Sequence, residues 1–313
     1  MSAALVVVLQ TLLLVALAPL WNGVVGALRA RFQMRRGAPV LQRYRDLWKT
    51  LGKETVLSDG ASALARFAPY AVLGAAVAIG TWTPVLTTAP GLGFAGDLVM
   101  TVALLAAMRV LLALLALEAG TPFGGMAASR HLMISALAEP ALMLAVFTLA
   151  IGARSTDLAR ISAAVVATPT AWISPSHLLA LTAMWIVVIA ETGRVPVDNP
   201  ATHLELTMVH EGLTLDVSGG HLALLEWAAA IRQLVLLTLV ANLFLPWGIA
   251  LVPTPAALGV ALLAWLGKLL LFAVVVAVTE SSTARMRLFR IPEFLGMAFL
   301  LALLALTSDS LLR

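Results

Sequence analysis

The sequence predicts an all-α integral membrane protein with about eight transmembrane helices. Hydrophobic residues make up 61% of the chain and charged residues only 12%, whereas soluble domains typically carry about 25% charged residues. The apolar residues gather into eight runs rich in Leu and Ala, each near the length of roughly 20 residues that crosses a bilayer. Because backbone polar groups cannot stay unpaired in lipid, and the runs are too long for barrel strands, we expect helices.

The eight runs form one polytopic membrane domain, 1–313, because no repeat or long linker divides them. The first 28 residues carry no charge, and Arg29 and Arg31 follow them. A secretory signal would place its basic residues first, so we expect this run to be a retained helix. The predicted spans cover residues 2–21, 67–89, 98–117, 132–152, 172–190, 223–246, 255–279 and 294–311.

Lysine and arginine are distributed unevenly between alternate loops. With the N-terminus outside, the inner loops hold nine in 29–66, and also Arg130, Arg194, Arg285, Arg287 and Arg290. The outer side holds only Arg154, Arg160 and Arg313. Since positive charge accumulates on the cytoplasmic side, the sequence predicts that both termini face outward.

Composition also excludes several kinds of chemistry. The chain has no cysteine, which rules out disulfides, thiolate metal sites and thiol nucleophiles. Any redox centre is therefore expected on a partner protein. The net charge of +4 is small, and no basic face with stacking aromatic residues suggests nucleic-acid binding.

The first inner loop, 29–66, contains an expected amphipathic helix. From Val40 to Leu51, apolar residues recur at spacings of three and four, and basic residues occupy the other positions. This pattern predicts a helix in the membrane interface, with its aromatic face toward the lipid and its basic face outward. It fits a lipid-headgroup anchor, a docking surface for a peripheral protein, or both.

Five charged residues fall within the predicted spans: Arg109, Glu139, Glu226, Arg232 and Lys268. A charge at a helix centre costs about 3 kcal/mol on insertion scales, so such residues line cavities or pair with one another. The set predicts a polar axis through the bundle. Buried ion pairs that only fix helix packing are the alternative interpretation. Pro140, next to Glu139, is expected to loosen its helix.

The second inner loop, 191–220, is an acidic island between two apolar runs. Asn199-Pro200 resembles a helix start, and a helix from Pro200 to Asp216 would align His203, Thr207, His210 and Thr214 on one stripe. Glu205 and Asp216 would lie on nearly the opposite side. Thr214 stands where a zinc-peptidase motif needs its second histidine. A mixture of carboxylates and imidazoles favours proton relay, with a solvated acidic loop as the alternative.

This loop resembles the signature loop of a known family. The segment Glu191-Thr-Gly-Arg194-Val-Pro196-Val-Asp198-Asn-Pro200, with Glu205-Leu206 after it, is similar to the subunit-1 (subunit-H) family, the membrane heel subunit of respiratory complex I. The first inner loop and the pair Arg130 and Glu139 match in order and spacing. Its matching residues are Gly37, Gln42, Asp46, Lys49, Lys53 and Glu54. The resemblance covers nearly the whole chain.

The stretch from Asp198 to Glu211 more closely resembles the form in membrane-bound group 4 nickel–iron hydrogenases, such as formate hydrogenlyase and the energy-converting hydrogenases. Ala201 and His203 stand where the quinone-using branch carries Glu, and Gly193 replaces Asn, so these positions argue against quinone binding. The resemblance implies a non-catalytic subunit of the inner membrane that holds no cofactor or metal itself. It implies hydrogenase-like large and small subunits, carrying the nickel–iron centre and iron–sulfur clusters, and antiporter-like membrane subunits as partners.

The candidate site residues form two sets, one for a relay and one for docking. The expected proton or charge relay comprises Glu191, Asp198, Glu205, Glu211, Asp216, Glu139, Glu226, Arg109, Arg232 and Lys268. The expected docking surface for the soluble arm comprises Arg35, Arg36, Gln42, Asp46, Lys49, Arg130, Arg194, His203 and His210. The alternatives are a quinone-site heel subunit of an NADH dehydrogenase, a purely structural anchor, and a stand-alone transporter that uses the buried bases.

Overall fold

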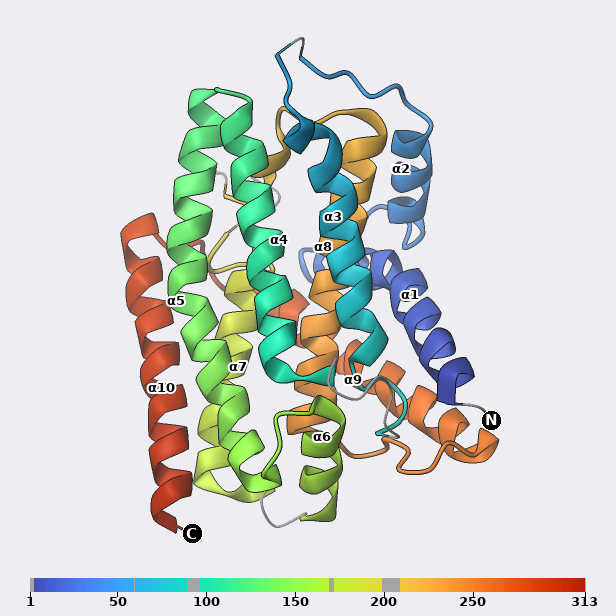
Figure 1. Ribbon diagram of the computed structural model, residues 1–313, viewed down its shortest axis with the longest axis vertical. Coiled ribbons are helices and arrows are strands. Elements are labelled where there is room, and N and C mark those ends of the chain that lie inside the picture. The colour runs from blue at the N-terminus through green and yellow to red at the C-terminus, as the bar shows by residue number, and fades with distance from the viewer. Residues whose placement is uncertain (1–2, 59, 89–95, 169–171, 199–208, 313) are drawn as a thin grey trace.

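The computed structural model describes residues 3–58, 60–88, 96–168, 172–198 and 209–312 (Figure 1). In chain order the α-helices are α1 (Ala3–Phe32), α2 (Gln42–Leu51), α3 (Ala63–Trp82), α4 (Leu98–Glu118), α5 (Pro122–Ala153), α6 (Leu158–Ala167), α7 (Pro175–Glu191), α8 (Gly219–Leu239), α9 (Pro255–Ser282) and α10 (Ile291–Leu312). Short 3-10 helices, η3 (Glu211–Thr214) and η5 (Leu288–Arg290), and a π-helical turn, η4 (Val240–Phe244), complete the described elements.

The predicted all-α membrane fold is confirmed. Each of the eight apolar runs coincides with one helix, and in the described part of the chain seven helices are long and apolar enough to cross a bilayer. The eighth, α7, has 17 residues, at the lower limit for a transmembrane helix. Some helices are longer than the predicted runs, and α5 reaches 32 residues and continues through Pro140. Others are shorter, and α3 ends at Trp82, before the predicted end of its run.

Three helices begin at the same sequence motif. Thr121-Pro122, Ser174-Pro175 and Thr254-Pro255 each place a hydroxyl residue at the N-cap and a proline at the first helical position. In every case the side-chain oxygen accepts a hydrogen bond from a backbone N–H in the first turn. The proline lacks an N–H that would have no helical partner there, so these starts are locally favoured.

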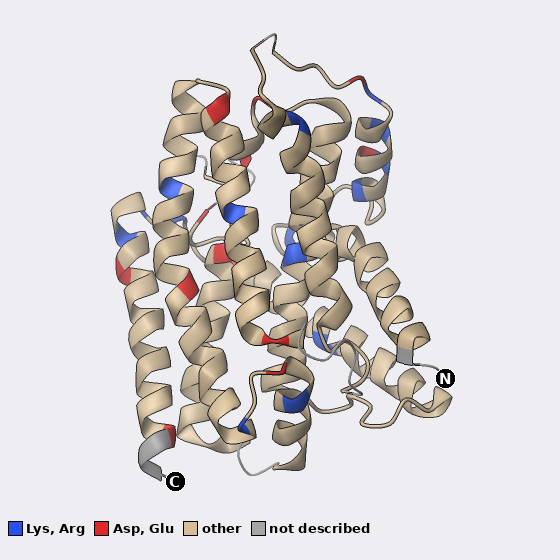
Figure 2. Cartoon of the chain, viewed as in Figure 1, with Lys and Arg blue, Asp and Glu red and all other residues tan. Residues whose placement is uncertain are grey.

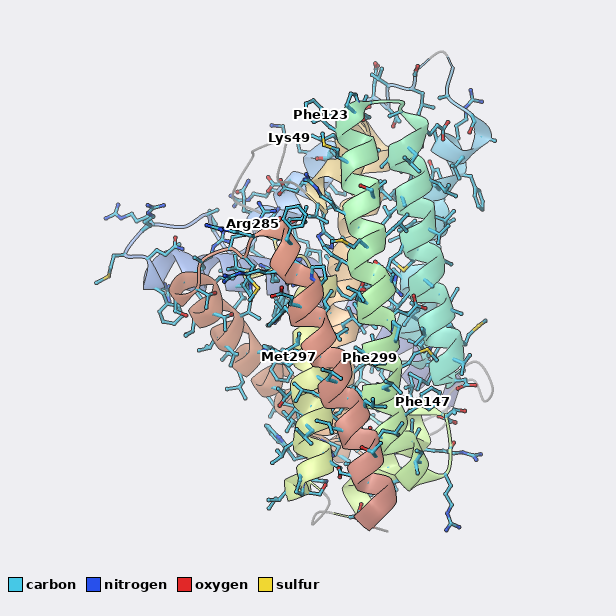
Figure 3. All side chains as sticks on the ribbon, turned by 90° about the vertical axis from the view of Figure 1, so that its left-hand side faces the viewer. Lys49, Phe123, Phe147, Arg285, Met297 and Phe299 are labelled. Atoms are coloured by element: carbon cyan, nitrogen blue, oxygen red, sulfur yellow. The ribbon has the colours of Figure 1, made fainter. Side chains whose placement is uncertain are left out.

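Helix α8 lies at the centre of the bundle. From Ala230 to Phe244 every residue is buried, with α3, α1 and α2 packed against the helix. On the other side α5 packs against α4, α7 and α10. Figure 3 shows α10 crossing in front of α7, with Met297 and Phe299 on its length; both side chains are more than one-third exposed. Such apolar exposure fits a lipid-facing or partner-facing surface.

The loops divide the molecule into two ends. One end, called the basic end here, carries α2, the α4–α5 turn and the start of α8, and Figure 2 shows Lys and Arg gathered on and around α2. Both chain termini lie away from this end (Figure 1). The opposite end carries α6, a short helix that the sequence analysis took for a loop. Asp157 caps it by accepting hydrogen bonds from Ala159 N and Arg160 N.

Two expected helices differ in their details. The amphipathic helix exists as α2, but its two aromatic residues differ in their surroundings: the Tyr44 hydroxyl donates to Ala16 O of α1, whereas Trp48 is 81% exposed. The predicted helix from Pro200 to Asp216 is wrong in the part that the structure describes, where only Glu211–Thr214 is helical, as a 3-10 turn. The remainder of that prediction falls on residues 199–208, outside the described residues.

Candidate functional site

Arg109 joins two carboxylates from two other helices. Its Nη1 atom lies 2.6 Å from Oε1 of Glu191, and its Nη2 atom lies 3.2 Å from Oε2 of Glu139. Arg109 and Glu191 are buried, while the side chain of Glu139 is 32% exposed. One guanidinium in the bilayer region therefore connects α4, α5 and the end of α7, and the connection reaches the surface of α5 through Glu139.

Arg232 of α8 balances the charge of this cluster. It is buried, and Glu191 and Arg109 are the charged groups that act on it electrostatically. Two guanidinium groups and two carboxylates therefore share one region. Arg232 Nη1 makes no hydrogen bond with any described residue. A buried donor of this kind normally has a partner, so the cluster can bind further polar groups.

A second cluster surrounds Glu280, which the sequence analysis missed. This carboxylate lies at the end of α9 and accepts a hydrogen bond from Arg194 Nη1 (3.1 Å) and another from Arg29 Nη1 (3.3 Å). Arg194 also donates to Asn22 and Gln233 and lies over the Trp21 ring. Burial lowers the pKa of the Arg194 guanidinium, and the Glu280 carboxylate opposes that shift.

Arg194 was expected to dock a partner, but its side chain is only 12% exposed, and the hydrogen bonds just described fasten it within the chain. Glu280 could have been found from its position. It directly follows an apolar run, at the end that faces the basic inner loops. A carboxylate in that position is expected to pair with one of their arginines. The two arginines thereby fix α1, α9 and the loop after α7 to one another.

Asp198 organises the acidic loop. Its Oδ1 atom lies 3.0 Å from Nη2 of Arg285, and its Oδ2 atom accepts a hydrogen bond from His210 N at 3.3 Å. The backbone N–H of Met286 donates to Pro196 O (2.8 Å), so the loop after α7 and the segment before α10 are held together. Figure 3 shows Arg285 just ahead of α10.

A cavity of about 330 Å³, called the α2 cavity here, lies between α1, α2 and α8 at the basic end. Asp198, His210 and Glu226 line it, together with four arginines: Arg29, Arg43, Arg194 and Arg232. Glu211, a predicted relay residue, also lines it. The acidic loop and the first basic loop therefore meet around one hollow, which the sequence alone could not show.

Two histidine rings are in contact at the wall of this cavity. His210 is on the cavity wall, and the His131 ring packs edge-on against it, with ring centroids 5.2 Å apart. His131 is 1% exposed. His131 was not predicted as a site residue, because a histidine can be neutral and is then compatible with an apolar run. Its spacing of eight residues from Glu139, which places both on one helix face, was the available signal.

Several expected relay residues lie outside the Arg109 cluster. Lys268 is 1% exposed and donates to Ala241 O and to Asn242 Oδ1 at η4. Asn242 follows Arg232 by ten residues, or about 15 Å along a helix, so Lys268 does not join the Arg109 cluster. Glu226 was expected to be buried and is exposed. Asp216 is also exposed, accepts from Thr121 Oγ1 and lines a separate cavity of about 530 Å³.

The expected docking residues on the first loop lie at the surface. Arg35, Arg36 and Lys49 are exposed, and Gln42 Nε2 donates to Asp46 Oδ1 (2.8 Å) within α2. Arg130 is half-buried on α5. His203 and Glu205 lie outside the described residues. In the part of the chain that the structure describes, no three His, Asp or Glu side chains gather closely enough to hold a metal ion.

Comparison with known proteins agrees with this architecture. The family profile described as NADH dehydrogenase matches residues 3–308. Formate hydrogenlyase subunit 4 of Escherichia coli (strain K12) is 35% identical over 300 residues, which cover 96% of this chain and 96% of that relative. Hydrogenase-4 component C of the same organism is 34% identical over 297 residues, 95% of this chain and 92% of that relative.

A solved structure shows the same fold. A chain of the membrane-bound sulfane sulfur reductase, described as an archaeal respiratory membrane complex, superposes with a TM-score of 0.78. The match covers 99% of this chain and 100% of that chain, at 20% sequence identity. The predicted resemblance to the complex I membrane subunit and its hydrogenase branch is confirmed by these matches. The chain belongs to the NADH dehydrogenase family.

Proposed function

We propose that this chain is the membrane subunit that joins a hydrogenase-type soluble arm to the membrane arm of a complex I-related oxidoreductase, and that it relays protons or charge between them. The observation that carries this proposal is the succession of polar groups from the α2 cavity at the basic end, past Asp198 and His210, to Arg109, Glu191 and Glu139 inside the bundle. A packing-only role would not require a cavity at one end of that succession.

The relatives support the hydrogenase type of complex. Both bacterial relatives are named as components of hydrogenase systems and match over at least 92% of their length. By this proposal the partners are hydrogenase-like large and small subunits, which hold the nickel–iron centre and iron–sulfur clusters, and antiporter-like membrane subunits. The complex would lie in the cytoplasmic membrane, with the basic end and the soluble arm on the cytoplasmic side.

Within the proposal the predicted residues divide by location. The exposed cations Arg35, Arg36 and Lys49 suit the docking surface. Asp198, Glu211, Glu191 and Glu139 suit the relay, with Arg109 and Arg232 holding its charge in balance. Arg194, bound to Glu280, suits a structural role beneath the cavity. Lys268 suits a structural role at η4.

The α2 cavity bears on the quinone alternative. A quinone site needs an apolar channel with a few polar groups. Four arginines and three acids line this cavity, and an apolar ring would have to displace their solvation. The charged lining favours proton or ion traffic over quinone binding. A quinone-site inhibitor that slows the complete complex and protects residues of the α2 cavity from labelling would favour the alternative.

The proposal is tested on the complete complex, purified through an affinity tag on this chain. Hydrogenase activity is measured in the complex, once through its natural membrane pathway and once with a dye that takes electrons directly from the soluble arm. Glu191→Gln is expected to lower the first activity and spare the second, with nickel and iron present in the preparation. If the purified complex contains neither nickel nor hydrogenase activity, the proposal is wrong.

A further inference from the structure

Two imidazole rings from different segments of the chain meet at the wall of the α2 cavity. His210 lines the cavity, and His131 packs behind it from α5, with ring centroids 5.2 Å apart and planes at 80°. The charges of Arg232, which also lines the cavity, and of Arg109 act on the His131 ring. The pair therefore occupies the boundary between the cavity wall and the buried cluster.

All four ring nitrogens of this pair are buried and make no hydrogen bond with any described residue. The closest approach is His210 Nδ1 to Asp198 Oδ2 at 3.5 Å, longer than a good hydrogen bond. A neutral imidazole carries one donor and one acceptor, and buried polar groups are costly without partners. Water is the small ligand that satisfies both functions, so these nitrogens fit a water-bridged arrangement.

Helix α5 continues the series of polar groups. His131, Ser135 and Glu139 follow one another at intervals of four residues, so they share one face of the helix, about 6 Å apart along its axis. Ser135 Oγ is also buried and makes no hydrogen bond with a described residue. Two consecutive hydrogen bonds span about 5.6 Å, so single waters fit the intervals between these groups. The stripe ends at Glu139, which pairs with Arg109.

Gly193 makes room for the His210 ring. It has a φ of +61°, and a Cβ atom placed on it would lie 2.6 Å from Nδ1 and 2.9 Å from Cγ of His210. The imidazole therefore rests directly on the Gly193 backbone. Positive φ by itself does not demand glycine, because asparagine also adopts it. The required property is the absence of a side chain beneath the ring.

We propose that His210 and His131 pass protons, through bridging water, between the α2 cavity and Glu139, and that Gly193 positions His210 for this transfer. In each transfer one ring nitrogen takes up a proton on the cavity side while the other releases one toward Ser135 and Glu139. The ring is neutral before and after, and no electron moves. This inference rests on the proposed relay function, for which it supplies the connecting residues.

The test replaces His131 in the complete complex. His131→Phe fills the same space without ring nitrogens, and the coupled hydrogenase activity is expected to fall at least about tenfold, with the dye-linked activity of the soluble arm unchanged. Added imidazole is expected to restore part of the coupled activity in His131→Ala, which a packing role would not allow. If His131→Phe does not assemble, His131→Gln retains polarity and is expected to show the same loss.

The chain offers a matched control. His221, in the first turn of α8, is also buried, packs against the Tyr70 ring and has one nitrogen without a described partner, but it lines the other cavity. His221→Phe is expected to leave coupling intact. Full coupled activity in His131→Phe, while Glu139→Gln loses it, overturns the histidine path and leaves the proposed function standing. Full activity in both variants overturns the relay itself.

The role of Gly193 is tested by a pair of substitutions. Asn in Gly193→Asn tolerates the positive φ but carries a Cβ into the His210 ring, so coupled activity is expected to fall as far as in His210→Ala. In the double variant Gly193→Asn/His210→Ala the loss is expected to equal that of either single variant, because both remove the same contact. A Gly193→Asn complex with wild-type coupling, or fully additive losses, contradicts the positioning role.

Discussion

Arg109 Nη1 lies 2.6 Å from Glu191 Oε1, although 82 residues of chain separate the two. Both side chains are 4% exposed. An ion pair in so dry a place is stable only when both partners are present, because a single charge left behind has no solvent. The same arginine reaches Glu139, so the contact ties three helices together.

This pair should be sensitive to single changes and tolerant of a matched double change. Glu191→Ala is expected to lower the free energy of unfolding by about 3–5 kcal/mol, since it leaves Arg109 buried with only Glu139. The double variant Arg109→Met/Glu191→Met should lose much less. Thermal unfolding of the detergent-solubilised protein measures both. A loss in the double variant that equals the sum of the losses in Glu191→Met and Arg109→Met would show that the charges do not interact.

Glu280 should prove to be a structural residue. Glu280→Gln removes the charge that Arg29 and Arg194 share, and we expect a loss of about 3 kcal/mol. The matched control is Arg160→Gln, whose exposed ion pair with Asp157 is 3.8 Å long and should contribute under about 1 kcal/mol. The two variants are compared by the same unfolding assay. A Glu280→Gln protein as stable as the control would contradict the role assigned here.

Lys268 should affect stability and not coupling. Its ammonium group donates to Ala241 O and Asn242 Oδ1, and Lys268→Met leaves both acceptors buried without that donor. The expected cost is about 1–3 kcal/mol for each lost partner. Once assembled, the variant complex should keep its ratio of coupled to dye-linked activity. A selective loss of coupled activity in Lys268→Met would show that Lys268 takes part in the relay.

Charge on the first loop should control attachment of the soluble arm. Arg35 and Arg36 are exposed and lie just before α2, so the double variant Arg35→Gln/Arg36→Gln should not change the stability of this chain. We expect the arm to dissociate at lower salt than in the wild type, because exposed charges are screened by ions. Gel filtration across a salt series measures this. An unchanged salt dependence would place docking elsewhere.

The sequence was sufficient for the fold because lipid leaves few choices. Eight apolar runs had to become helices, and hydroxyl–proline pairs such as Thr121-Pro122 marked where some of them start. It was insufficient for α6, whose ten residues are too few to cross a membrane, and for the stretch after Val209, where helical spacing does not outweigh the contacts that Asp198 makes with His210 and Arg285.

The candidate site was predictable by residue type and not by pairing. Arg109, Glu139 and Arg232 stood out because a charge is conspicuous in an apolar run. Their partners depend on how helices rotate against one another, which no local pattern states. Glu280 escaped because it lies at the border of its run. His131 was not predicted because a histidine can be neutral in an apolar run. Its contact with His210, which marks it as a site residue, arises only in the folded chain.

In the proposed function, this chain passes charge from the α2 cavity to Glu139 and onward to the membrane arm. This transfer is tested most directly by measuring charge movement per hydrogen molecule turned over in proteoliposomes that contain the complete complex with Glu139→Gln. We expect charge movement and coupled turnover both to fall at least about tenfold, with full dye-linked activity. Wild-type charge movement in this variant would contradict the proposed transfer.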